Sequence, residues 1–193
     1  MKRLAASVFL ALAVTASGWT QSLEKIGFRV ELASPKASVA ETQKQGVGGN
    51  VMAILSLGPR AVQLATMLDF VTFPGDYKWI QGEKIEYDSR YVVTVALGPR
   101  VGNERGAYII PALSVSFGSL YDRPDFKEEG LPIGVDFSVG TLVPVAGRGM
   151  LDVGVRLAMT NFLTESIPEG TWGEGVDLEM LSNMMCLYAG LSF

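Results

Sequence analysis

The chain has 193 residues, 48% of them hydrophobic, and a formal net charge of −4. This length fits one domain of ordinary size. A single cysteine excludes an internal disulfide, and one cysteine without any histidine argues against a zinc site. An acidic chain without a basic patch is also a poor candidate for nucleic-acid binding. We therefore expect no cofactor, no metal ion and no nucleic-acid partner.

The first 18 residues have the layout of a secretory signal peptide. Lys2 and Arg3 supply a positive start, residues 4–14 form an apolar run, and small residues follow at 16–18. The apolar run is shorter than the roughly 20 residues that a transmembrane helix needs. We expect residues 1–18 to be cleaved, so that 19–193 form the mature domain.

From residue 26 onward, apolar and polar side chains alternate, which is the pattern that predicts β-strands. In chain order, the alternating segments are 26–32, 50–58, 62–70, 90–97, 108–118, 133–143, 151–159 and 185–193. In the clear segment 133–143, Val135 and Phe137 share one face and Asp136 lies on the other. Segment 50–58 is the weakest, because Met52 and Ile54 fall on its supposedly polar face.

Prolines bear on the strand boundaries. Pro111 lies inside the fifth segment, and proline cannot donate to a strand ladder, so we expect regular pairing to start after it or a bulge to form there. The tetrapeptide Leu-Gly-Pro-Arg occurs at 57–60 and again at 97–100. We expect both copies to form short turns, because Gly-Pro ends a strand sharply.

The connections alternate in length along the chain. Long ones, at 33–49, 73–89, 119–132 and 161–183, alternate with short ones at 58–61, 98–106 and 144–150. Outer-membrane barrels have short periplasmic turns and longer outside loops, with an even strand number that places both termini in the periplasm. The pattern predicts an all-β fold, an eight-stranded antiparallel up-and-down transmembrane β-barrel.

The polar face of the strands is small and charged, which suits a narrow barrel interior. We expect a lumen charge network there, with Tyr108 and Tyr188 belonging to it. Its charged members are Arg29, Glu31, Asp69, Arg90, Asp136, Asp152 and Arg156. These charges could form a gate or selectivity ring, or they could pair and fill an interior just wide enough for side chains. We favour the filled interior.

The chain ends on Phe193 after an alternating strand. This resembles the terminal strand of outer-membrane barrels, whose final phenylalanine is recognised by the barrel-assembly machinery. With the signal-peptide layout, the mature chain resembles the small eight-stranded outer-membrane barrels of the OmpA and OmpX type. The resemblance implies the outer membrane of a Gram-negative bacterium, with outer-membrane lipid and lipopolysaccharide as surroundings and the assembly machinery as a partner during biogenesis. It is architectural, and no functional residue carries over.

We expect a non-enzymatic, structural or surface-interaction role with acidic extracellular loops. The last connection, 161–182, holds five acidic residues and no basic one. Known enzymes among small barrels need a histidine, the usual general base near neutral pH, and this chain has none. Two alternatives stay open: a small-solute or lipid conduit, and a soluble periplasmic lipocalin-like binding protein with its apolar faces inside. The sequence names no extracellular partner.

Overall fold

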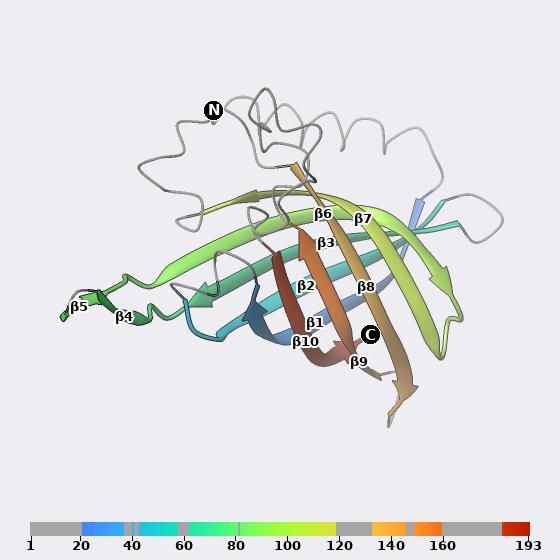
Figure 1. Cartoon of the computed structure of the whole chain (residues 1–193). Coiled ribbons are helices and arrows are strands. Elements are labelled where there is room, and N and C mark those ends of the chain that lie inside the picture. The colour runs from blue at the N-terminus through green and yellow to red at the C-terminus, as the bar shows by residue number, and fades with distance from the viewer. Residues whose placement is uncertain are drawn as a thin grey trace, which may run out of the picture.

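Eight strands of the computed structural model close into an antiparallel barrel, which confirms the expected fold class (Figure 1). The structure describes residues 21–36, 40, 43–57, 62–80, 82–118, 133–145, 149–159 and 183–193. The expected signal peptide and the acidic connection 161–182 lie outside these ranges. The barrel strands are β1 (Gln21–Pro35), β2 (Gly46–Leu57), β3 (Val62–Phe73), β6 (Arg90–Gly102), β7 (Ala107–Phe117), β8 (Ile133–Pro144), β9 (Met150–Met159) and β10 (Asn183–Ser192). No helix in the described part of the chain is long and apolar enough to cross a membrane.

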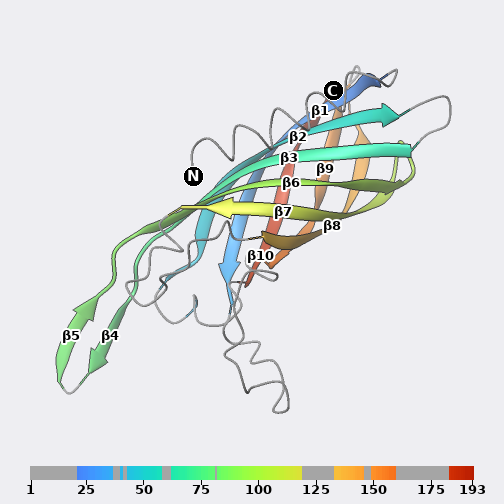
Figure 2. The same cartoon turned by 90° about the horizontal axis from the view of Figure 1, so that it is seen from above.

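Barrel strands that follow one another in the chain are also neighbours in the wall, and β10 pairs with β1 to close it. Two backbone hydrogen bonds, of 3.1 and 2.9 Å, join Ile26 and Phe193 at the closing seam. The beginning of β1 and the end of β10 therefore lie together at one end of the barrel, as Figure 2 shows. Each predicted strand is present, and most run further than the alternation indicated, since β1 already begins at Gln21.

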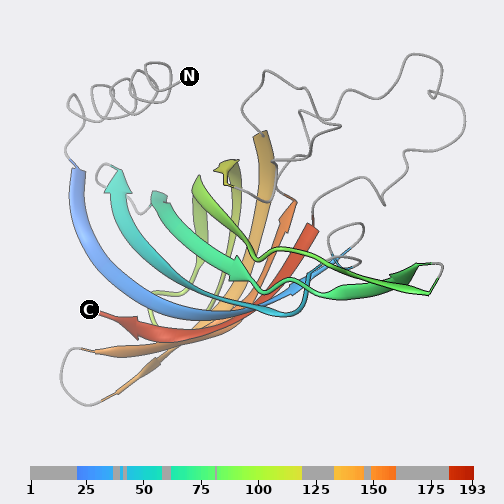
Figure 3. The ribbon, with the colours of Figure 1, turned by 90° about the vertical axis from the view of Figure 1, so that its left-hand side faces the viewer.

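The connection predicted at 73–89 contains a hairpin that sequence alternation did not reveal. Strands β4 (Tyr77–Ile80) and β5 (Glu83–Glu86) pair with each other and leave the barrel wall at the end opposite the C-terminus (Figures 2 and 3). The base of the hairpin is braced by the preceding connection. Gln43 forms a β-bridge with Gly75, and the Lys44 amide donates to the Pro74 carbonyl at 2.9 Å.

Two expectations about prolines are wrong. The second Leu-Gly-Pro-Arg, 97–100, lies inside β6, and the turn follows at 103–106. Pro111 neither delays β7 nor forms a bulge, because it pairs with Phe137 of β8 in regular register. Because proline has no N–H, Pro111 lacks a backbone hydrogen bond only to β6, and its pairing with β8 is unaffected. In the first copy, β2 ends at Leu57, and residues 58–61 are outside the described ranges.

Apolar side chains point out of the barrel, and charged ones point in. Along β1, Phe28, Val30 and Leu32 are exposed, whereas Arg29 and Glu31 are buried. The lipocalin-like alternative requires the opposite arrangement, so the structure contradicts it. The inward face is not uniformly polar, however.

The segment that looked weakest in sequence, 50–58, is regular strand. Met52 and Ile54 are fully buried and point inward with other apolar residues. The assumption that the inner face is always polar was therefore wrong. The segment looked weak because its inner positions are as apolar as its outer ones.

Candidate functional site

One guanidinium joins three carboxylates in the middle of the barrel. Arg156 of β9 lies 2.8 Å from Glu31 of β1, 2.7 Å from Asp69 of β3 and 3.1 Å from Asp136 of β8. All four side chains are buried. The planar guanidinium presents its donors in a fixed fork, so a single side chain can hold carboxylates from three directions. This carboxylate cluster ties β9 to its neighbour β8 and also to β1 and β3, which are not its neighbours in the wall.

A second network surrounds Arg29. Its Nε donates to the Asp152 carboxylate at 2.9 Å, and its Nη2 donates to the Tyr108 hydroxyl at 2.8 Å. The Tyr108 hydroxyl donates to Asp152 at 2.6 Å and lies 2.8 Å from the Tyr188 hydroxyl. The Arg29 guanidinium also covers the Tyr188 ring, 4.3 Å from its centroid. In this network the positive charge of Arg29 balances the negative charge of Asp152. The tyrosine hydroxyls supply the further hydrogen bonds.

The tyrosine hydroxyls occupy room that two glycines leave open. A Cβ built on Gly140 would lie 2.3 Å from the Tyr188 hydroxyl and 2.6 Å from that of Tyr108. A Cβ on Gly154 would also lie 2.3 Å from the Tyr188 hydroxyl. Real Cβ atoms do not approach so closely, so any other residue at these positions would displace the rings. The inner wall is thus shaped to hold both tyrosines.

Apolar layers lie on either side of the charged groups. Along β3, Ala65 and Met67 come first, then Asp69, then Val71 and Phe73, and all five are buried. The layer toward the termini, here called the lower apolar layer, consists of Met52, Ile54, Ala65, Met67, Ala96, Tyr108, Ile110, Ala112, Leu142 and Met150. The upper apolar layer consists of Ala33, Val71, Phe73, Val92, Ala158, Met184 and Cys186. The charges are therefore enclosed between two layers of packed hydrocarbon.

Polar side chains cover the barrel mouth near the termini. Arg100 donates to the Gln63 side chain at 2.5 Å, and Gln63 in turn donates to Glu24 at 2.6 Å. The Lys25 ammonium donates to the backbone carbonyl of Glu104 at 2.8 Å. Since β1 and the β6–β7 turn are not neighbours in the wall, this last bond spans the mouth. This rim is not predictable from the alternation, because the Leu-Gly-Pro-Arg motif places Arg100 in an expected turn.

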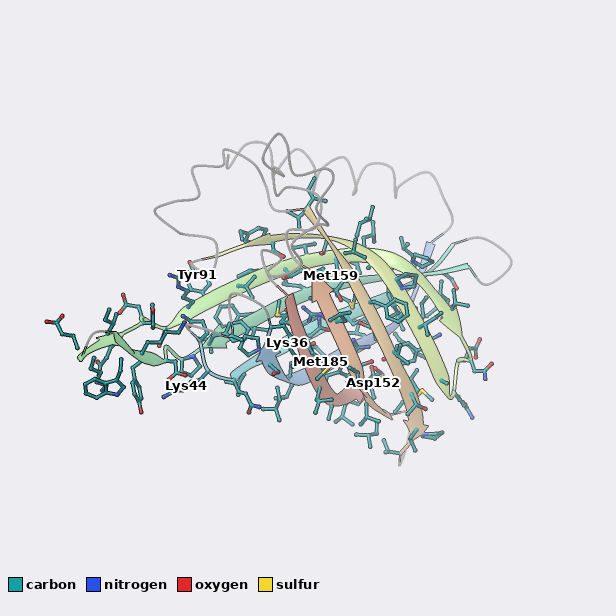
Figure 4. All side chains as sticks on the ribbon, viewed as in Figure 1. Lys36, Lys44, Tyr91, Asp152, Met159 and Met185 are labelled. Atoms are coloured by element: carbon teal, nitrogen blue, oxygen red, sulfur yellow. The ribbon has the colours of Figure 1, made fainter. Side chains whose placement is uncertain are left out.

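The structure brings six of the seven predicted lumen charges into these two networks (Figure 4 labels Asp152). Arg90 is in neither of them. It is the first residue of β6 and is half-exposed, and Val92 of the upper apolar layer separates it from the charged groups. Tyr108 and Tyr188 lie where they were expected, beside Arg29. Phe193 is 62% exposed at the closing seam, and its role as an assembly signal stays a prediction.

The hairpin outside the barrel presents an exposed aromatic face. Trp79 is 67% exposed, and Tyr77 lies on the same side of the two-stranded sheet. Lys44 and Lys84 lie 5.8 and 4.7 Å from the centroid of the Tyr77 ring (Figure 4 labels Lys44). The hydrogen bond and the charge of Lys84, 2.5 Å away, lower the pKa of the Glu86 carboxyl. Within the described ranges, no three acidic or cysteine side chains are grouped so that they could hold a metal ion.

Of the comparisons with known proteins, only the one with solved structures found matches. No family model matches the sequence, and no curated protein matches it. The crystal structure of Neisserial surface protein A matches 89% of this chain and 97% of that one, with 15% identity and a TM-score of 0.52. The backbone structure of the Yersinia pestis outer membrane protein Ail in a phospholipid bilayer nanodisc matches 88% of this chain and 99% of that one, with 12% identity and a TM-score of 0.49. At such identities, the likeness to the first structure establishes the fold.

Proposed function

We propose that this chain, which has the fold of the small outer-membrane barrels of the OmpA and OmpX type, is a sealed, non-enzymatic surface protein of the outer membrane. The observation that carries the proposal is the filled interior. Two buried ion networks occupy its middle, and packed apolar layers enclose them on both sides. The barrel wall then serves as an anchor, and the part that meets other molecules is outside it.

The outer surface supports a membrane location. Large apolar side chains around the wall are exposed, among them Val30 at 67% and Leu113 at 63%. Monomeric soluble proteins rarely expose apolar patches of more than a few hundred Å². An outward apolar band on a closed barrel is what a bilayer requires, because closure leaves no strand edge unpaired in lipid. Outer-membrane lipid and lipopolysaccharide are the surroundings that such a band fits.

The filled interior argues against the conduit alternative. A solute would have to pass both apolar layers and displace Arg156 from three carboxylates. Removing one partner from a buried ion pair costs about 3–5 kcal/mol, so such openings would be rare. An eight-stranded barrel has little room beyond its own side chains. The lumen charges therefore fill and hold the barrel rather than select ions.

The hairpin is the best-defined surface for an interaction outside the membrane. It carries Trp79 and Tyr77 exposed on one face, and Gln43 and Lys44 brace its base. Aromatic side chains offer a large contact area at low entropic cost, which is why they are common at binding surfaces. In our proposal this end faces the cell exterior, and both termini lie in the periplasm.

Fractionation and gel migration test the membrane location. We expect the protein in the outer-membrane fraction, with an unboiled band that migrates faster than the boiled one. In planar bilayers the purified barrel should give no conductance steps, with a sixteen-stranded porin as the positive control. A soluble periplasmic protein with one unshifted band would refute the membrane location, and steady conductance steps would refute the sealed interior.

Orientation can be tested on intact cells with single cysteines in a Cys186→Ala background. Trp79→Cys on the hairpin should react with a membrane-impermeant maleimide. Asn103→Cys, exposed in the turn at the other end, is the matched control and should react only after the outer membrane is permeabilised. The reverse labelling pattern would show that the hairpin faces the periplasm.

A further inference from the structure

Two prolines face each other across one seam of the barrel. The pairing between β6 and β7 is regular up to Leu97 and Leu113 and resumes at Val101 and Ile109 in the same register. Between these positions, that register places Pro99 directly opposite Pro111. Among the described residues, this seam has the fewest paired positions of all eight in the wall.

The proline pair falls on a position that should carry two hydrogen bonds. Antiparallel pairs alternate between those that exchange both backbone bonds and those that exchange none. The Asn103 amide donates to the Ala107 carbonyl at 3.0 Å, which makes that pair a bonded one. Counting in steps of two from it, the pair of Pro99 and Pro111 is also a bonded position. Neither residue has an N–H, so both ladder bonds are missing there.

The gap lies near the middle of the apolar band. Starting at Leu23 of β1 and moving each time to the partner residue in the next strand, four steps lead to Pro111 of β7. Four further steps lead around the rest of the wall and back to β1 at Ser34. Because a barrel spreads its stagger evenly over its strands, Pro111 lies at about the height of the midpoint of that stretch, level with Phe28 of β1 on the opposite side of the barrel. Both prolines are exposed on the outer face.

Of the four inner positions at the gap, Gly98, Ile110 and Ala112 are apolar, and the fourth is Arg100. The Arg100 guanidinium is turned away to the polar rim, where it donates to Gln63 and to the Asn103 carbonyl. Ala96 of β6, with Ile110 and Ala112 of β7, belongs to the lower apolar layer, and Gly98 lies between them. Hydrocarbon inside thus meets hydrocarbon outside across a wall that lacks two bonds. At the β1–β10 closing seam, by contrast, the paired register runs without interruption from Gly27 to Pro35.

We propose that the barrel wall opens laterally at the β6–β7 seam, and that the opening admits the acyl chain of a membrane lipid rather than water or ions. The missing bonds make this the easiest seam to separate. The apolar lining behind it selects hydrocarbon. The lower apolar layer is packed while the wall is closed, so an acyl chain enters only while the seam is open and only by displacing side chains of that layer. The two ion networks and the upper apolar layer still block passage along the barrel axis, so the opening is compatible with a barrel that does not conduct.

Amide hydrogen exchange in detergent micelles tests the opening without any variant. The amides of Leu97, Val101, Ile109 and Leu113 should exchange about 10 to 100 times faster than those of the paired residues Val51 and Leu68 in the β2–β3 seam, because two hydrogen bonds are missing nearby. Equal protection of the two seams would overturn the proposal.

A double variant then restores the bonds. Pro99→Val with Pro111→Val supplies both N–H groups and should slow exchange at the β6–β7 seam to the rate of the β2–β3 seam. Pro144→Val at the end of β8 is the matched control and should change nothing at this seam. If the double variant leaves exchange as fast as before, the prolines are not the cause and the proposal fails.

Cysteine labelling tests what the opening admits. In a Cys186→Ala background, Ala112→Cys lies behind the seam, and Ala65→Cys lies behind intact seams. We expect a lipid-soluble maleimide to label Cys at 112 at least about ten times faster than at 65, in line with the exchange difference. A water-soluble maleimide should label neither. Equal labelling of the two sites by the lipid-soluble reagent, or rapid labelling by the water-soluble one, would refute the acyl-chain proposal.

Discussion

The replacement Arg156→Met removes the one positive charge that three buried carboxylates share. Methionine has a similar length, so the change deletes charge and hydrogen bonds while leaving little empty space. Glu31, Asp69 and Asp136 lie within 3.1 Å of the guanidinium and would lose their common partner. Removing one member of a buried ion pair costs about 3–5 kcal/mol. We expect the free energy of unfolding to fall by at least that amount.

Arg29→Met is the matched control for this loss. It also deletes a buried arginine, but the only carboxylate it leaves behind, Asp152, keeps a 2.6 Å hydrogen bond from the Tyr108 hydroxyl. We expect a smaller loss of about 1–3 kcal/mol, the cost of leaving a buried polar group poorly satisfied. The difference in unfolding free energy between the two variants measures the cost of leaving three carboxylates, instead of one, without their arginine.

Urea unfolding in phospholipid vesicles, followed by the fast-migrating band on unboiled gels, gives these free energies. The neutral replacements Glu31→Gln, Asp69→Asn and Asp136→Asn, combined with Arg156→Met, should recover most of the loss because no buried charge is left unpaired. If Arg156→Met alone costs less than about 1 kcal/mol, the carboxylates do not depend on the guanidinium and the reasoning is wrong.

Two further predictions concern the tyrosine pocket and the hairpin. Gly140→Ala places a Cβ 2.3 Å from the Tyr188 hydroxyl and should destabilise the barrel by about 1–3 kcal/mol in the same urea assay. Gly49→Ala, whose Cβ has its nearest neighbour at 3.6 Å, should stay within about 0.5 kcal/mol, and equal effects would contradict the packing argument. On the hairpin, Lys84 lowers the pKa of Glu86, so the ion pair persists above that pKa and is lost as the pH falls through it. An NMR titration should show the Glu86 pKa rising when Lys84 is replaced by Gln, and no change would show that the pair does not form in solution.

Alternation alone was enough to predict the barrel strands and their inward residues. A strand has a period of two, so once one face is known every other residue along it follows. Arg29 and Glu31 on β1, and Asp152 and Arg156 on β9, all point inward as the pattern indicates. The lengths of the connections then predicted an even-stranded barrel with its first and last strands adjacent.

The same rule failed where inner and outer positions have similar chemistry. Segment 50–58 looked doubtful because Met52 and Ile54 face inward, into the lower apolar layer. The hairpin strands carry mixed side chains on both faces because neither face is covered, so no alternation reveals them. A Gly-Pro dipeptide suggested a turn at 97–100, but β3 pairs with β6 throughout that stretch and keeps it extended.

Which side chains enter the barrel can be predicted from the chain alone, because the period of a strand is a local property. Which of these side chains meet depends on how the barrel closes. Arg156 and Glu31 are 125 residues apart, and they touch because the barrel closes with a particular stagger. The same stagger sets Pro99 opposite Pro111 and separates Arg90 from the charged groups. It also brings Lys25 close enough to the Glu104 carbonyl to donate a hydrogen bond across the barrel mouth. Register between strands depends on the whole closed wall, so no local pattern in the chain contains it.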